Sequence, residues 1–122
     1  MSHATRLPLF DAACDQARHT FNARCIELRS MRASLALLDE HMPALRELGL
    51  RLHPSSIHWS PESSALSIST WHCCDAAHLH HALLSLGFKE VARRAYASFI
   101  VLGLKSGRLK INLQVPAAEA AA

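Results

Sequence analysis

Apolar residues in the first third of the chain recur at steps of three and four, which is the spacing of one face of an α-helix. The pattern predicts one long amphipathic helix over residues 8–42. From Leu28 onward the apolar positions also repeat every seven residues, as they do in a short coiled-coil seam. Pro43 interrupts the pattern and predicts the first turn of a separate short helix that stops at Gly49. The apolar positions are Phe10, Cys14, Ala17, Phe21, Cys25, Leu28, Met31, Leu35, Leu38, Met42 and Leu45.

The part of the chain from residue 50 to residue 115 has a different pattern, in which apolar and polar residues alternate over short stretches. Alternation predicts strands near 57–59 and 66–70, with a turn between them. Asp75 is a suitable N-cap for a helix over 76–86, which Gly87 ends. Strands at 88–94, 98–104 and 108–115 follow, and the last two form a hairpin. The order predicts an α+β fold: the long helix, then ββ-α-ββ(β), with helices on one face of an antiparallel sheet.

The predicted first helix is too long for the predicted sheet to cover. A helix over 9–41 measures about 50 Å, whereas five strands span only about 24 Å. Either the helix breaks near Ser30 and folds back, or its overhang packs against another chain. We expect a homodimer, with its interface on the seam of Leu28, Met31, Leu35, Leu38 and Met42.

Composition fits one small globular domain. The chain has 122 residues, of which 50% are apolar, and a formal net charge of +3. These values predict a single domain over 1–115 and a disordered, alanine-rich tail over 116–122. No apolar run approaches the roughly 18–20 residues that span a bilayer, and no hydrophobic signal region begins the sequence. We therefore expect a cytoplasmic protein that is not bound to a membrane.

Histidines and cysteines gather in the segment 71–81. Both residue types bind zinc, which prefers four ligands in a tetrahedron, so His72, Cys74, His78 and His81 are candidate ligands. However, His78 and His81 fall on the predicted solvent face of their helix, and no second pair of ligands lies in a separate segment. A solvated, histidine-rich helix face is the competing interpretation, and we expect no cofactor.

Signatures of catalysis are missing from the sequence. The four glycines are not clustered into a phosphate-binding loop, and no carboxylate pair or nucleophile motif can be identified. We therefore predict a protein that is not an enzyme.

Basic residues offer a second possible function. Phosphate contacts from such residues give salt-dependent binding to nucleic acids, although a small net charge and interspersed acidic residues favour an ordinary solvated surface. The candidates are Arg18, Arg29 and Arg32 on one stripe of the first helix, and Arg93, Arg94, Arg108 and Lys110 near the last strands.

The preferred interpretation is a small protein-interaction module that dimerises through its first helix and binds another protein. Trp71 and His72 are further candidates for the binding surface, because an exposed tryptophan is a common hot spot. A concrete form is a bacterial phage or mobile-element accessory protein that inhibits or modulates a host complex, such as a defence system. A nucleic-acid-binding regulator and a zinc-binding protein are the alternatives.

Overall fold

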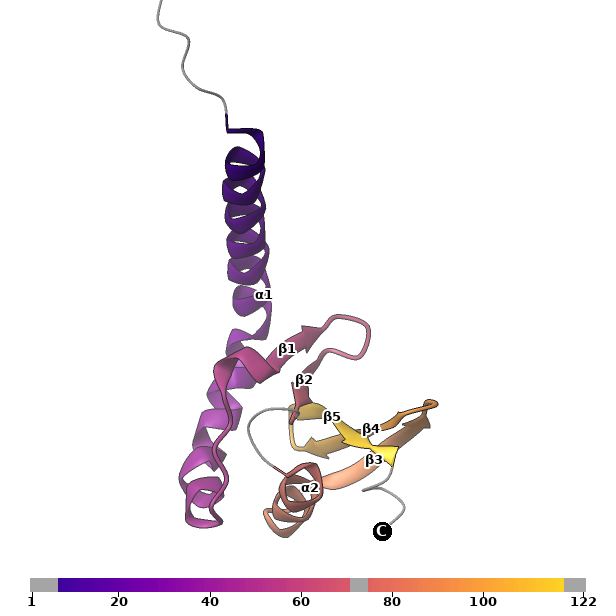
Figure 1. Ribbon diagram of the computed structural model, residues 1–122. Coiled ribbons are helices and arrows are strands. Elements are labelled where there is room, and N and C mark those ends of the chain that lie inside the picture. Colours follow the sequence, from indigo (N-terminus) through magenta and orange to yellow (C-terminus); the bar gives the residue numbers. More distant parts are fainter. Residues whose placement is uncertain (1–6, 71–74, 118–122) are drawn as a thin grey trace, which may run out of the picture.

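The described residues form two α-helices and a five-stranded sheet, so the protein belongs to the α+β class that its sequence predicts. The computed structural model describes residues 7–70 and 75–117 (Figure 1). The elements in chain order are α1 (Pro8–Glu47), the 3-10 turn η1 (Pro54–Ser56), β1 (Ile57–Ser60), β2 (Ala65–Ser69), α2 (Ala76–Ser85), β3 (Lys89–Ala95), β4 (Phe99–Ser106) and β5 (Leu109–Pro116).

The sheet is mixed, and this corrects the expectation of a purely antiparallel one. Its strand order is β1-β2-β5-β4-β3. Three neighbouring pairs are antiparallel, but β2 and β5 run parallel in the middle of the sheet. The reason is the connection: the chain leaves β2 through α2, reaches the far edge at β3 and returns through β4. Because the route contains a helical crossover, the strand that closes beside β2 has the same direction.

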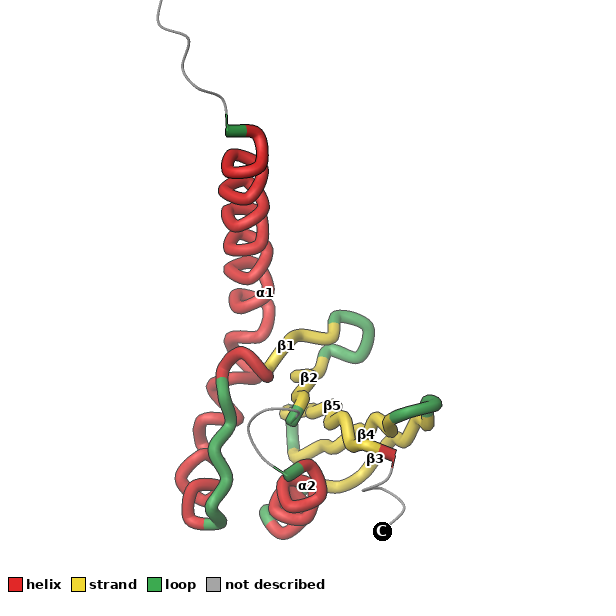
Figure 2. Tube along the Cα trace, viewed as in Figure 1, coloured by secondary structure: helices red, strands yellow, loops and turns green. Residues whose placement is uncertain are grey.

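Both helices contribute to one core against a single face of the sheet, as the sequence predicts. Alternation along β5 buries Leu109, Ile111 and Leu113, whereas Lys110 between them is exposed. The buried side chains of α1 and α2 join this cluster. Figure 2 shows α2 and the second half of α1 beside the strands that they cover. The helical members of the core are Met31, Leu38, Leu45, Ala76, Leu79, Ala82 and Leu83.

Helix α1 is continuous, so the alternative of a break near Ser30 is excluded and the separate helix predicted at Pro43 is wrong. It has 40 residues, which corresponds to about 60 Å, and Pro43 lies inside it. A proline inside a helix loses one backbone hydrogen bond and costs about 3 kcal/mol. Burial of Leu38 before it and Leu45 after it offsets that cost, because both side chains must face the sheet.

Helix α1 ends just before Gly49, the residue at which the sequence predicts that the separate short helix stops. Gly49 has a φ of +80°, a left-handed conformation in which glycine carries no steric penalty. The backbone N–H of Leu50 donates to the carbonyl of Leu45 at 2.9 Å, which closes the last turn. The chain then reverses along α1 toward β1.

Pro116 and Ala117, which the sequence predicts to be part of a disordered tail, are paired with the sheet. Pro116 belongs to β5 and pairs with Phe99, and the N–H of Ala117 donates to the carbonyl of Ser98 at 3.1 Å. Residues 118–122 lie outside the described residues.

Candidate protein-binding site

The first half of α1 has no cover from the rest of the described chain. All side chains from residue 8 to residue 23 are exposed, and in Figure 1 this indigo part of the helix projects away from the sheet. We call residues 8–23 the bare half. Its large apolar side chains include Phe10, which is 62% exposed, and Phe21, which is 66% exposed. Both phenylalanines lie on the apolar stripe of the projecting helix, and no other part of the described chain packs against them.

The apolar stripe of the bare half and the stripe that packs on the sheet share one heptad frame, which Arg24 interrupts between them. Phe10, Cys14, Ala17 and Phe21 follow one another at steps of four, three and four. The same heptad frame then passes through Leu28 to the buried residues of the second half. One heptad frame therefore runs the length of α1 with a polar interruption at Arg24, and the sheet covers only its second part.

Arg24 and Glu27 anchor α1 at the point where the bare half ends. The backbone N–H of Trp59 donates to the Glu27 carboxylate at 3.0 Å. The Arg24 guanidinium donates to the carbonyls of Pro54 and Ile57, at 3.0 and 2.9 Å, and also pairs with Glu27. These side chains meet backbone groups at the outer edge of β1, where a neighbouring strand would otherwise bind. The anchor fixes the direction in which the bare half leaves the domain.

The ionisation of Glu27 reflects this arrangement. Burial favours the neutral acid, but the hydrogen bonds from Trp59 and Arg24 and the positive charge of Arg24 outweigh it. The pKa of the Glu27 carboxyl is therefore held below the ordinary value for glutamate. The anchor is consequently an ionised one at neutral pH.

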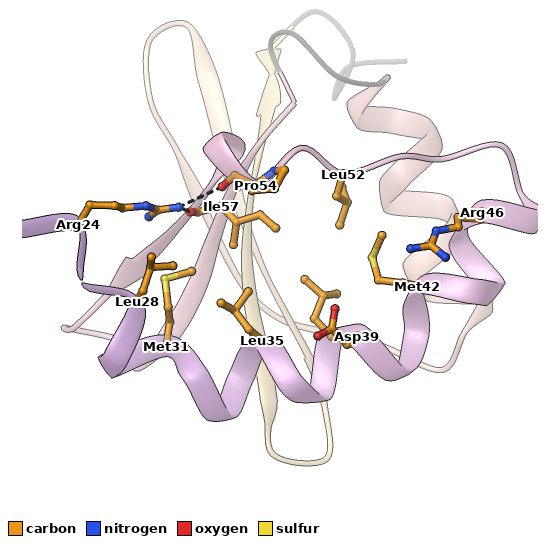
Figure 3. Close-up of a pocket in the computed structure, with 11 residues that line it drawn as sticks. Arg24, Leu28, Met31, Leu35, Asp39, Met42, Arg46, Leu52, Pro54 and Ile57 are labelled. Atoms are coloured by element: carbon orange, nitrogen blue, oxygen red, sulfur yellow. Dashed lines mark hydrogen bonds between the residues drawn. The ribbon is translucent and has the colours of Figure 1, made fainter. Parts of the chain in front are cut away.

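An apolar groove begins beside the anchor and follows the second half of α1. It lies between the helix and the segment 50–57 and encloses about 330 Å³. Figure 3 shows the apolar side chains pointing into it, with Arg24, Asp39 and Arg46 among the residues around them. The lining residues are Arg24, Leu28, Met31, Leu35, Leu38, Asp39, Met42, Arg46, Leu52, Pro54 and Ile57.

The five residues of the expected dimer seam all line this groove, so the structure brings them together. Their setting nevertheless differs from the expectation. Met31 and Leu38 are 0% and 2% exposed and belong to the core, while Leu35 and Met42 pack partly against it. Only Leu28, at 40%, is substantially exposed. The seam at 28–42 is chiefly an internal contact because the sheet of the same chain covers it.

A second, polar hollow of about 460 Å³ lies on the sheet face opposite the helices. Gly103 and Ala92 form part of its floor, and a methyl group added at Gly103 would lie 3.0 Å from the Ala92 Cβ. Arg94 and Tyr96 lie at its side, and their hydrogen bond raises the pKa of Arg94 above that of a typical arginine. Sequence reasoning did not identify this hollow, because it depends on which strands become neighbours.

The candidate nucleic-acid residues are exposed but divide into separate groups. Three are on α1, which packs at the β1 side of the sheet, and two are on β3, at the opposite edge. Two of them form salt bridges with acidic residues: Arg18 lies 3.9 Å from Asp15, and Arg93 lies 2.7 Å from Glu90. The residues are Arg18, Arg29 and Arg32 on α1, Arg93 and Arg94 on β3, and Arg108 and Lys110 at the β4–β5 hairpin.

The candidate zinc ligands are only partly within the described residues. His78 and His81 are exposed on α2, as the sequence predicts. His72 and Cys74 lie outside the described residues, as does Trp71. Within residues 7–70 and 75–117, no three histidine, cysteine or acidic side chains are grouped closely enough to hold a metal ion.

Sequence reasoning placed Phe10 and Phe21 on the apolar face but not among the candidate site residues, and it did not single out Arg24 and Glu27. The heptad spacing contained the signal for the phenylalanines, which occupy the same seam as the chosen residues. Nothing in the sequence signals that Arg24 and Glu27 reach backbone groups more than 25 residues away. Among the described residues, no helix is both long enough and apolar enough to cross a membrane. No protein-family model, curated protein or solved structure matches the chain.

Proposed function

We propose that the protein is a non-enzymatic protein-interaction module whose docking element is the bare half of α1. The observation that carries the proposal is the uninterrupted exposure of residues 8–23 on a helix with two exposed phenylalanines. A helix of this length is marginally stable in water when nothing packs against it. A partner that covers its apolar side would remove that weakness.

The anchor supports this proposal, because it presents the helix to a partner in a fixed direction. Arg24 and Glu27 hold α1 to η1 and β1 by three hydrogen bonds, and the second half is packed on the sheet. The C-terminal end of the bare half is therefore ordered before a partner binds. Association then costs less conformational entropy than it would for a helix that is free at both ends. Leu28 extends the apolar surface from the bare half toward the groove.

Matched substitutions test the proposal. Replacing Phe10 and Phe21 together by Glu places charges in the contact surface, whereas Ile26→Glu places one on another side of the helix. Ile26 is 63% exposed, so it matches Phe21 in exposure and differs from it in direction. We expect Phe10→Glu/Phe21→Glu to weaken binding by about tenfold or more, because buried aromatic anchors dominate interfaces.

Tagged full-length protein is first used to capture binding proteins from cells, and an untagged copy of the chain itself counts as one of them. Each captured protein is then purified, and its affinity for the three tagged proteins is measured by titration. Partners bound by the wild type and by Ile26→Glu, but lost by Phe10→Glu/Phe21→Glu, support the proposal. Equal binding by all three proteins would contradict it. The narrower idea of a phage or mobile-element protein that inhibits a host complex stays a prediction, which the identity of the captured protein would test.

A further inference from the structure

We propose that the partner of the bare half is a second copy of the same helix, bound antiparallel. The two-fold axis would pass between Asp15 and Gln16. This inference rests on the proposed function and gives the docking element a defined occupant and register. It follows from the heptad frame, the length of the bare half and the position of its charges.

The heptad frame places the small and large apolar residues in complementary positions. With Cys14 and Phe21 as a positions, Phe10 and Ala17 are d positions. In an antiparallel pair, the a residues of one helix pack against the d residues of the other. Phe10 then packs against Phe21 of the second copy, and Cys14 against its Ala17. A Phe10–Phe21 layer therefore lies at each end of the contact. Between them, the small side chains of Cys14 and Ala17 let the two helices approach closely.

The same register uses the full length of the bare half and nothing beyond it. When Cys14 is opposite Ala17, Pro8 at the start of one helix lies opposite Ala23 of the other. The next residue, Arg24, is where α1 begins to bind its own domain. Each helix start therefore reaches the edge of the other domain, and the pairing covers the whole exposed segment. Any large shift of register leaves part of one helix uncovered or forces it into the sheet domain.

The charges beside the seam agree with the antiparallel direction. Asp11 and Arg18 are both e positions, and e positions face each other across an antiparallel pair. In the proposed register, Asp11 of each copy faces Arg18 of the other, which gives two ion pairs related by symmetry. In a parallel pair, Arg18 would face Ala13 instead. In the single chain, Arg18 lies 3.9 Å from Asp15, a b position outside the seam, and pairing would exchange this exposed contact for Asp11 of the second copy.

The first experiment measures the mass of the full chain by sedimentation equilibrium, up to about 100 µM, which detects a micromolar Kd. We expect the wild type and Ile26→Glu to dimerise, and we expect Phe21→Glu to raise the Kd by about tenfold or more. Circular dichroism checks that the variants are folded. Two Phe21 side chains lie in each dimer, so one substitution removes both aromatic layers.

The second experiment tests direction and register by mixing two charge-reversed variants. Asp11→Arg and Arg18→Asp should each dimerise more weakly than the wild type by about fivefold, because like charges then face each other. Mixed together, they should form a heterodimer at least as readily as the wild type forms a homodimer. The control mixes Asp15→Arg with Arg18→Asp. Asp15→Arg makes the same charge change as Asp11→Arg but outside the seam, so this mixture should not favour the heterodimer over the two homodimers.

The outcomes separate this inference from the proposed function. A dimer whose charge-reversed variants pair as described supports both. A dimer in which mixing does not restore association overturns the antiparallel register. If the wild type remains a monomer while Phe10→Glu/Phe21→Glu loses another captured protein, the second copy is excluded and the docking element stands. A monomer whose binding is insensitive to those substitutions overturns both.

Discussion

The two halves of α1 have the same hydrophobic pattern and opposite surroundings. In the second half, Met31, Leu38 and Leu45 of the seam are buried against the sheet. In the first half, Phe10 and Phe21 of the same seam are exposed. Periodicity therefore indicates that a helix face requires cover, but it does not indicate what supplies the cover. For the second half the cover is the domain itself, and for the bare half we propose another chain.

The boundary between the halves is a polar one. Arg24 occupies a d position of the seam and turns toward the backbone of the segment 54–57 instead of an apolar partner. Glu27, in the next turn, binds the N–H of Trp59. The anchored ion pair therefore divides the seam into two apolar surfaces, one that the sheet covers and one that is exposed.

The largest contrast should appear on truncating an apolar side chain in each half. Leu38→Ala removes a buried side chain, and we expect it to lower the free energy of unfolding by about 2–5 kcal/mol. Leu9→Ala, in the bare half, should change it by less than about 0.5 kcal/mol in dilute solution. Urea denaturation followed by circular dichroism measures both. Equal effects would mean that the two halves do not differ as the structure describes.

Replacing the proline inside the covered half should stabilise the protein. Pro43→Ala restores a backbone N–H that can donate to the carbonyl of Asp39 and removes the clash of the proline ring. We expect a gain of about 1–3 kcal/mol in the free energy of unfolding, because proline is about 3 kcal/mol less favourable than alanine inside a helix. A melting-temperature series reports it. A loss of stability would show that Pro43 contributes packing that outweighs its backbone cost.

Removing the carboxylate of the anchor should lower the free energy of unfolding by an amount no larger than the gain expected for Pro43→Ala. Glu27→Ala leaves the N–H of Trp59 and the Arg24 guanidinium without their carboxylate, and we expect a loss of about 1–3 kcal/mol. Glu40→Ala, at an exposed position of the covered half, is the control and should change little. If the two variants unfold at the same urea concentration, the hydrogen bonds of Glu27 contribute nothing to folding.

The anchor also predicts the direction of a pH effect. Because the pKa of Glu27 is lower in the folded chain than in the unfolded chain, the unfolded chain binds more protons between those two values. Its stabilisation is complete above the ordinary glutamate pKa and is lost as pH falls through the lowered value. Glu27→Gln should therefore show a smaller loss of stability on acidification than the wild type. Unfolding curves at neutral and acidic pH compare them, and parallel losses would contradict this role.

The smallest effect concerns Phe21 in the single chain. Phe21→Ala should change the free energy of unfolding by less than about 0.5 kcal/mol at concentrations where the protein is monomeric. Any larger loss should emerge only as the concentration rises, since association then stabilises the folded chain. A loss that is independent of concentration would place Phe21 in an internal contact.

Most of the fold could be predicted because its signals are local. Spacing located α1, and alternation located the strands, including the β4–β5 hairpin. Asp75 marked the start of α2, where its carboxylate accepts from the N–H of Ala77 at 2.9 Å. The end of α1 was misplaced because local propensity treats Pro43 as a stop, whereas core packing on both sides of it continues the helix.

The candidate site was only half predictable. The sequence contains the whole seam, but the residues chosen from it for a partner, such as Met31 and Leu38, are those that the sheet covers. The correct division required knowing where the sheet lies along α1. It also required knowing that β2 and β5 are neighbours, which follows from the crossover and not from either strand.

The sequence by itself determined the elements, their amphipathic faces and the excess length of the first helix, because these depend on residues close together in the chain. Only the tertiary structure decided which part of the seam is internal, where Arg24 and Glu27 anchor it and which way the bare half points. Those features depend on contacts between residues 30 or more positions apart. Such contacts form only when the sheet is assembled, since apolar burial selects the one arrangement in which both helices cover the same face.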